Sequence, residues 1–488
     1  MNNNKNVMES DKLKDSNAIR HEFSIAMSAM YQSEVPLYGD LLDLVAEVNT
    51  EVLTQHSEIK EQLEHTGEID RISMERHGAI RLGTAAELHM MRRLFAVMGM
   101  YPVGYYDLAP AGVPVHSTAF RAIDTQALNQ SPFRVFTSLL RLDLIDDEVL
   151  KKEAVAVLAN RQIFTANAIS LIERFEEKGN LTLEEGKQFV KEALETFRWH
   201  DKTPVSKKLY QRLSDQHGLI ADVVGFKGPH INHLTPRTLD IDTVQQGMLA
   251  KGIPPKAIIE GPPKRDCPIL LRQTSFKALE ETVSFKNPEG DYEQGHHTAR
   301  FGEIEQRGVA LTPKGRSLYD QLLNQSREQL GVTPNEDNAL EYYQILENAF
   351  EAFPDDYRTL HDEGLAYFYY QAVNDSPYPS SSDSELNLDS LEESYSDDSI
   401  SKQTMTQLIE KGIVRFEPIV YEDFLPVSAA GIFQSNLHDD KQSSYKGNSN
   451  QNEFEKALGV HVYDELALYA DQQAESLHKC LFRLKYSI

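Results

Sequence analysis

The chain reads RHGAIRLGTAAELHMMRRLFAVMGMYPVGYYDL from Arg76 to Leu108 and NHLTPRTLDIDTVQQGMLAKGIPPKAIIEGPP from Asn232 to Pro263. Each stretch has a short extended run containing His-x-x-x-Arg, then a Thr or Asp suited to a helix N-cap, then an amphipathic helix. In both, the helix stops at a glycine (Gly99 or Gly252), where a left-handed C-cap is needed, and a proline-led extended run follows. The two stretches therefore predict a strand–helix–strand unit that is used twice.

Further strand-like runs follow each copy. The first copy continues with VPVHSTAFRAI and FRVFTSLLRLDL, and the second with CPILLRQTSFKALEETVSF and HTARFGEIEQRGVAL. This order predicts an α+β fold in which duplicated βαβββ modules form a curved sheet around a shared cavity. Chance similarity is the alternative, but the agreement of caps, glycines and His–Arg spacing favours duplication.

The remaining segments are assigned around these two modules. Residues 146–218 have a helical pattern, in which Thr182 precedes Glu184 and Glu185 as an N-cap with acidic residues in the first turn. The Ser- and acid-rich segment 375–401 is expected to be a mobile insertion, since it cannot bury enough apolar surface to fold. The predicted organisation is a polar disordered N-terminus (1–20), the first module with N-terminal helices (21–145), a helical insertion (146–218), the second module (219–316), a helical segment (317–374), the acidic insertion (375–401), and a strand segment with a C-terminal helix that completes the site (402–488).

Composition restricts the class of partner. The formal charge is −26, from 49 basic and 75 acidic residues, which argues against binding to nucleic acid or to an anionic membrane. With two cysteines, no apolar stretch of membrane-spanning length and no secretory signal, we expect a soluble cytoplasmic protein with a small-molecule partner. If that molecule is an anion, its site needs a local basic group.

The first candidate site residues are His77 and Arg81. We favour a strand here, whose inward face carries His77, Ala79 and Arg81. A neutral imidazole can bind a metal while a guanidinium four residues on clamps a carboxylate. The alternative is a hydrogen-bonded core histidine beside a surface arginine.

The second copy offers His233 and Arg237 in the same spacing, with His230 three residues earlier. His233 occupies the position that matches His77 and is the preferred ligand. His230 follows Gly228 and Pro229, and we expect it in the approach loop.

A carboxylate from FGEIEQRG can complete the set. Glu303 and Glu305 alternate along a predicted strand, so either can face the cavity, and a solvated charge ladder with Arg307 is the alternative. Other histidines that can substitute for a ligand are His116, His296 and His297, of which we expect the last two at the surface.

Two histidines and one carboxylate leave coordination positions open, which suits non-haem Fe(II) and oxygen chemistry, although the same set holds Zn, Mn or Ni. No phosphate-binding glycine loop, dinucleotide fingerprint or Gly-x-Ser-x-Gly turn is present in the sequence. The small-residue run from Val427 to Gly431 permits close backbone approach, either to a ligand or to another strand.

At these residues the sequence closely resembles the bacterial 2-oxoadipate dioxygenase/decarboxylases, also called hydroxyglutarate synthases, over nearly its whole length. The motifs that carry the resemblance include ERHGAIRLGT, GVPVHSTAFR, HINHLTPRTLDID, HTARFGEIEQRGVALTPKGR and YEDFLPVSAAGIFQSNL. The resemblance implies a vicinal-oxygen-chelate fold and Fe(II) held by His77, His233 and Glu303, the carboxylate four residues before the arginine of its strand. It also implies that Arg81 binds the substrate and acts in catalysis, and that the substrate meets His77, His233 and the Val427–Ser428 backbone.

The implied reaction converts 2-oxoadipate and O2 into 2-hydroxyglutarate and CO2 in lysine breakdown. Two alternatives are a Zn- or Ni-dependent isomerase or lyase of the glyoxalase type on the same fold, and a non-catalytic small-molecule-binding protein. Oxygen uptake with 2-oxoadipate separates these hypotheses.

Overall fold

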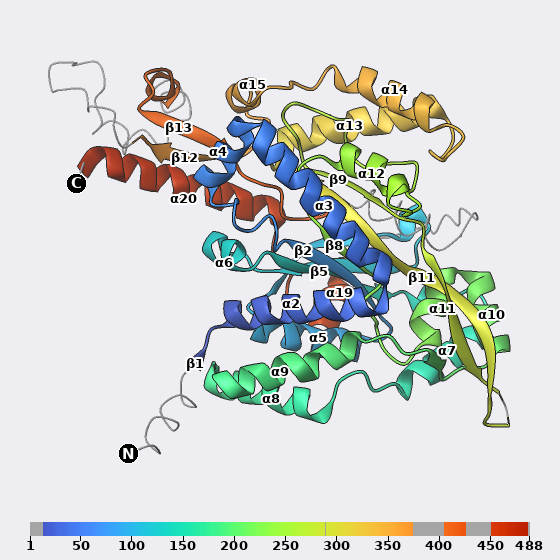
Figure 1. Cartoon of the computed structure of the whole chain (residues 1–488). Helices are drawn as coiled ribbons and strands as arrows, with labels where there is room; N and C mark the ends of the chain where they lie inside the picture. Colours follow the sequence, from blue (N-terminus) through green and yellow to red (C-terminus); the bar gives the residue numbers. More distant parts are fainter. Residues whose placement is uncertain (1–12, 288, 374–404, 426–449, 487–488) are drawn as a thin grey trace, which may run out of the picture.

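The structure is a computed structural model that describes residues 13–287, 289–373, 405–425 and 450–486 (Figure 1). The acidic insertion predicted at 375–401 lies outside the described residues, as do Val427 and Ser428. Among the helices formed by the described residues, none combines the length and the apolar character that crossing a bilayer requires.

Within the described residues, a mixed sheet of nine strands forms the centre of the protein. Its main path runs β3-β4-β5-β2-β8-β11-β10-β7, and β9 pairs with the C-terminal part of the long strand β11. The strands are β2 (Arg76–Leu82), β3 (Tyr101–Asp107), β4 (Val115–Arg121), β5 (Phe133–Leu140), β7 (Lys202–Thr203), β8 (His233–Pro236), β9 (Leu271–Ser275), β10 (Leu279–Lys286) and β11 (Tyr292–Arg307). The α+β class expected from the sequence is therefore correct.

The strands pair in the same order and with the same directions in both halves of the sheet. In the first half β2 is parallel to β5, β5 is antiparallel to β4, and β4 is antiparallel to β3. In the second half β8 is parallel to β11, β11 is antiparallel to β9, and Glu260 makes an antiparallel bridge to Gln273 of β9. The halves join where β2 and β8 run antiparallel, with Ala79 opposite His233.

Two details of the second copy differ from the expectation. Its proline-led run, all of it described, makes only isolated bridges at Pro255 and Glu260 instead of a strand. Proline lacks the N–H that a regular ladder needs, which accounts for the interruption. The run after it splits into β9 and β10, and β10 extends the sheet beyond the pairing pattern of the first half.

The local signals at the ends of the helices are confirmed. Thr84 and Thr182 each form a capping box, with Glu87 and Glu185 respectively, at the start of α5 (Ala85–Val97) and α9 (Leu183–Leu194). Gly99 and Gly252, with φ of 63° and 74°, end α5 and α12 (Ile241–Ala250) in the left-handed region.

The other helices and two small β-pairs surround the sheet. The stretch 146–218, predicted to be helical, contains several helices. In place of the single helix predicted at the C-terminus, the structure has two helices, the first of which ends at Gly459. The remaining elements are α2 (Ser16–Glu34), α3 (Pro36–Gln55), α4 (Ser57–Thr66), α6 (Thr125–Gln130), α7 (Glu148–Ala159), α8 (Ala166–Lys178), α10 (Lys207–Gln216), α11 (Gly218–Gly225), α13 (Pro313–Leu330), α14 (Ala339–Phe350), α15 (Tyr357–Asp362), α19 (Gln451–Leu458) and α20 (Glu465–Tyr486), with β1 (Leu13–Lys14) paired to β6 (Leu181–Thr182) and β12 (Phe368–Ala372) paired to β13 (Val414–Pro418).

The alternation of side chains along β2 separates two hydrophobic cores. Ile80 and Leu82 enter the core formed with α2, α3, α5 and α9, whereas Ala79 belongs to the core on the other face. Helices α2 and α3 cross in front of the central strands in Figure 1, and Tyr31 of α2 donates its hydroxyl to the carbonyls of Asn232 and Phe301 at 2.9 and 2.8 Å. His77 and Arg81, two residues to either side of Ala79, therefore lie on the face away from these helices.

Candidate metal centre

Three predicted ligands meet at the junction of the two halves of the sheet. His77 comes from β2, His233 from β8 and Glu303 from β11, and all three are buried. His77 Nε2 lies 3.2 Å from Glu303 Oε1, and His233 Nε2 lies 3.6 Å from Glu303 Oε2. Their potential ligand atoms all fall within 4.8 Å of one another, as binding to one ion requires.

Strand register explains the convergence. His233 is the residue of β8 that stands opposite Ala79 of β2 on one side and Phe301 of β11 on the other. Glu303 and His77 are each two residues from these partners and so occupy the same face.

Glu305 has a different position from Glu303. Its Oε2 lies 2.9 Å from His77 Nδ1, the ring nitrogen that faces away from Glu303. Arg307 donates to both oxygens of Glu305, at 2.9 and 2.8 Å, and Arg134 Nη1 lies 3.6 Å from Oε1. A carboxylate behind a histidine ligand fixes the ring and leaves the other nitrogen for a metal.

The electrostatics of the three side chains differ. Burial, with His77 and Arg81 nearby, lowers the pKa of His233 well below its usual value, so the ring is neutral and can act as a ligand. Burial raises the pKa of Glu303. Burial opposes protonation of His77, but Glu305 and Glu303 outweigh it and raise the His77 pKa.

The donor set fits a divalent cation. Two carboxylates lie beside His77 in a buried site, and a cation placed between the ligands offsets their charge and the cost of burying Glu303. Gln273 of β9 donates its amide to Glu303 Oε1 at 2.6 Å and so orients this carboxylate. Two neutral imidazoles and one carboxylate are the ligand types that suit non-haem iron and several other divalent metals.

The solvated charge ladder considered for Glu303, Glu305 and Arg307 is wrong, because all three are buried. Glu305 and Arg307 belong to a buried ionic cluster that, among the described residues, contains four arginines and four glutamates, and Glu303 lies beside it. Arg134 bonds Glu75 at 2.6 Å. Arg237, which the predicted repeat matches to Arg81, bonds Glu68 at 2.7 Å. The cluster consists of Arg71, Arg134, Arg237, Arg307, Glu68, Glu75, Glu305 and Glu422.

Arg81 is buried on the same strand as His77. Its Nη1 donates to Asp222 Oδ2 at 2.6 Å, and its charge contributes to lowering the pKa of His233. The reading of Arg81 as a surface residue is therefore wrong.

Three of the other candidate histidines (His116, His230 and His297) are buried, and His296 is exposed. His297 was expected at the surface, but it is buried, since β11 begins at Tyr292 and alternation turns His296 outward and His297 inward. His230 precedes β8, as expected, and joins His297 and Asp222 in a second buried group of donors. His116 packs against Phe454 with ring centroids 4.7 Å apart and belongs to neither donor group in the described part of the chain.

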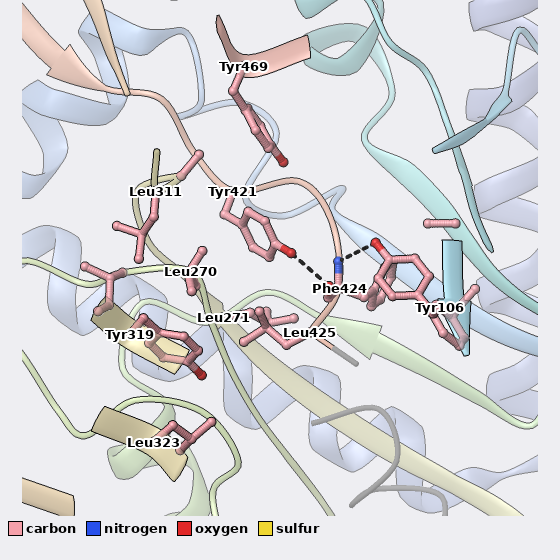
Figure 2. Close-up of a cluster of buried hydrophobic side chains, with 14 of the residues drawn as sticks. Tyr106, Leu270, Leu271, Leu311, Tyr319, Leu323, Tyr421, Phe424, Leu425 and Tyr469 are labelled. Carbon is pink, nitrogen blue, oxygen red and sulfur yellow. Dashed lines mark hydrogen bonds between the residues drawn. The ribbon is translucent and has the colours of Figure 1, made fainter. Parts of the chain in front are cut away.

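The late segment that precedes Val427 and Ser428 reaches the site. Phe424 packs edge-on against His77 with ring centroids 4.9 Å apart. Figure 2 shows its backbone held between two tyrosines: Tyr421 donates its hydroxyl to Phe424 O at 2.8 Å, and Phe424 N donates to the Tyr106 hydroxyl at 3.4 Å. The described part of this segment thus contributes to the wall of the candidate metal centre.

Asp222, Gln273 and Phe424 were not predicted as site residues. Gln273 lies in a predicted strand, where neighbouring side chains such as Arg272 and Gln273 point to opposite faces of the sheet. This alternation is the signal from which Gln273 could have been predicted to face the site. Asp222 lies on α11, where one acidic residue in an apolar helix has no characteristic spacing to a partner.

Comparison with known proteins identifies relatives over almost the full length. Residues 23–436 match the model of the family described as 2-oxoadipate dioxygenase/decarboxylase. Proteins with this name from Pseudomonas putida and Escherichia coli are 58% and 52% identical to the chain, over 95% of it and 96% and 97% of their own lengths. The crystal structure of a hydroxyglutarate synthase from Pseudomonas putida in complex with 2-oxoadipate is similar with a TM-score of 0.85 and 55% identity, covering 97% of this chain and 100% of that one.

Proposed function

Since this chain belongs to the 2-oxoadipate dioxygenase/decarboxylase family, we propose that it is an Fe(II)-dependent enzyme converting 2-oxoadipate and O2 into 2-hydroxyglutarate and CO2, in the breakdown of lysine. The reaction balances without a second organic substrate: one carbon leaves as CO2, and both oxygen atoms of O2 enter the products. The observation that carries the proposal is the meeting of His77, His233 and Glu303 in one buried site.

His77, His233 and Glu303 would hold the iron. Bound Fe(II) supplies the site at which the carboxylate and keto oxygens of a 2-oxo acid chelate and at which O2 is reduced. Glu305 and Gln273 orient the ligands, and the Phe424 ring excludes water beside His77.

Arg81 would bind the remote carboxylate of the substrate and so set which carbon faces the oxidant. It lies four residues from His77 on the same face of β2, about 13 Å along the strand. A long guanidinium side chain spans part of that distance, and an extended dicarboxylate spans the rest. Arg81 also supplies the charged hydrogen-bond donors that an anion needs in a chain of net charge −26. The Val427–Ser428 backbone is proposed to contact the same substrate.

We further propose that the two halves of the sheet are copies of one βαβββ module of the vicinal-oxygen-chelate type. The shared pairing sequence and the contribution of ligands from both halves support this. The two unpaired cysteines, Cys267 and Cys480, are consistent with our proposal that the protein acts in the reducing cytoplasm.

The test is anaerobic reconstitution with Fe(II), followed by addition of 2-oxoadipate and O2. We expect O2 uptake, CO2 release and 2-hydroxyglutarate in equal amounts, all lost in His77→Ala, His233→Ala and Glu303→Ala. Metal-dependent turnover of 2-oxoadipate that persists without O2 would instead identify an isomerase or lyase.

A further inference from the structure

Asp222 lies at the centre of the second donor group and uses both of its oxygens. Oδ2 accepts from Arg81 Nη1 at 2.6 Å and from Asn232 Nδ2 at 3.4 Å. Oδ1 lies 3.0 Å from His297 Nε2 and 3.2 Å from His230 Nε2. Asp222 is buried, and its contacts with Arg81 and His230 outweigh burial and lower its pKa well below the usual value, so it stays charged.

The two histidines are themselves fixed in place. The Tyr210 hydroxyl lies 2.7 Å from His297 Nδ1, and the Phe226 ring packs on His297 with centroids 4.4 Å apart. Trp199 packs edge-on against His230 at 4.7 Å. An aromatic wall supplied by the helical insertion and the loop after it therefore leaves Asp222 little freedom to move.

We propose that Asp222 is a positioning residue for Arg81: it binds one guanidinium nitrogen and so aims the other donors at the remote carboxylate of the substrate. This inference rests on the proposed function. An arginine side chain has many rotamers, and fixing one before the substrate arrives removes the cost of ordering it during binding. The planar guanidinium suits this double use, since one edge can bond Asp222 while another faces a ligand.

A second metal is the other chemistry that Asp222, His230 and His297 suggest, because their donor atoms also lie close together. The guanidinium 2.6 Å from the Asp222 carboxylate argues against it, since a cation placed there is repelled by Arg81 at short range. We therefore assign the group to Arg81.

The experiment measures equilibrium binding to the Fe(II) holoenzyme without O2, with two probes. 2-Oxoadipate carries the remote carboxylate, and 2-oxohexanoate has the same chain length but ends in a methyl group. We expect Asp222→Asn to weaken 2-oxoadipate binding about tenfold, as for the loss of one charge-assisted hydrogen bond, and to leave 2-oxohexanoate binding within twofold of wild type.

Arg81→Ala is the reference variant. If it does not weaken 2-oxoadipate binding, the assigned role of Arg81 fails, and the inference about Asp222 fails with it. If Arg81→Ala weakens binding but Asp222→Asn changes neither probe, only the inference about Asp222 is overturned. In the double variant the loss should equal that of Arg81→Ala alone, because Asp222 acts through Arg81.

Glu87→Gln is the matched control. Glu87 is a buried carboxylate bonded to Arg161 at 2.7 Å, and glutamine keeps its helix cap. It should bind both probes as wild type does. Equal loss of both probes in Asp222→Asn would indicate general damage and overturn the positioning role, as would a second equivalent of bound metal that this variant loses.

Discussion

His77 uses its two ring nitrogens for different partners, with Glu303 beside Nε2 and Glu305 beside Nδ1. The two glutamates are two residues apart on one strand and have the same charge, but the positions they occupy differ. Arg307 and Arg134 hold Glu305 ionised, and contact with Arg307 and His77 lowers its pKa to about 2 against the effect of burial. Glu305 is therefore a fixed anion on the Nδ1 side of His77, and Glu303 is the carboxylate on the Nε2 side, where the proposed metal would bind.

Glu305→Gln should weaken metal binding at this centre about 10- to 100-fold, the usual effect of losing a partner behind a histidine ligand. Glutamine can still contact Nδ1 but no longer supplies the negative charge that favours this ring orientation. Metal titration of the chelator-stripped protein measures the effect. Glu281→Gln, which also removes a carboxylate bound to an arginine (Arg300), should titrate as wild type does. Equal affinities in wild type and Glu305→Gln would refute the orienting role.

Site residues were predicted where a regular spacing in the sequence marked them. The repeated His-x-x-x-Arg pattern and strand alternation singled out His77, His233 and the pair Glu303/Glu305, and the family resemblance chose between the two glutamates. Asp222 reaches Arg81 across 141 positions of sequence, and no local period connects them. His297 was misplaced because the nearby Gly295 suggested a loop, whereas this glycine lies inside β11, where its Cα packs close to Phe285.

Among the elements, helix α20 docks through a partly buried acid at its first residue, Glu465, whose side chain is 19% exposed. Glu465 accepts a hydrogen bond from the Tyr106 hydroxyl at 3.1 Å, and Arg316 of α13 lies 3.8 Å away. Burial, with a contribution from Asp423, raises the pKa of Glu465 to about 7. In the unfolded chain a glutamate titrates near its ordinary value, about 4.3.

The sign of the resulting pH dependence follows from linkage. The folded chain binds the Glu465 proton more tightly than the unfolded chain, so this group lowers stability as pH rises from about 4.5 to about 7. Glu465→Gln keeps the hydrogen-bond acceptor without the charge. It should be more stable than wild type above pH 7 by roughly 1–3 kcal/mol, and the difference should vanish near pH 4.

Denaturant unfolding of both proteins at several pH values between 4 and 8 measures this difference. Glu475→Gln, on an exposed turn of the same helix, should show no such trend. A Glu465→Gln variant that is less stable than wild type at pH 8 would mean that the ion pair with Arg316 outweighs burial.

For the whole molecule, the central observation is that the candidate ligands come from both halves of the sheet, His77 from the first and His233 and Glu303 from the second. The repeat in the sequence predicted such a shared site, since two modules that pack side by side bring matching strands together. Helix caps and strand alternation supplied the element types. The sequence did not predict the crossing of α2 over β8 and β11 or the wall of aromatic rings, because these depend on contacts between distant segments.

Removal of the metal should destabilise the whole fold. An ion bound only by the folded state stabilises it by about 2.7 kcal/mol at a free concentration 100 times its dissociation constant. We expect the melting temperature to rise with added Fe(II) under anaerobic conditions and to fall with a chelator. His233→Ala should melt at the same temperature with and without Fe(II), and a shift that persists in this variant would place the stabilising ion elsewhere.

The balanced cluster of four arginines and four glutamates beside the site restricts how this protein can evolve. A single replacement strands an opposite charge in the interior, which typically costs about 3–5 kcal/mol, a large share of a natural protein's margin. Sequence drift through this region therefore has to proceed by compensated double changes, and random libraries will be depleted of viable variants at these eight positions.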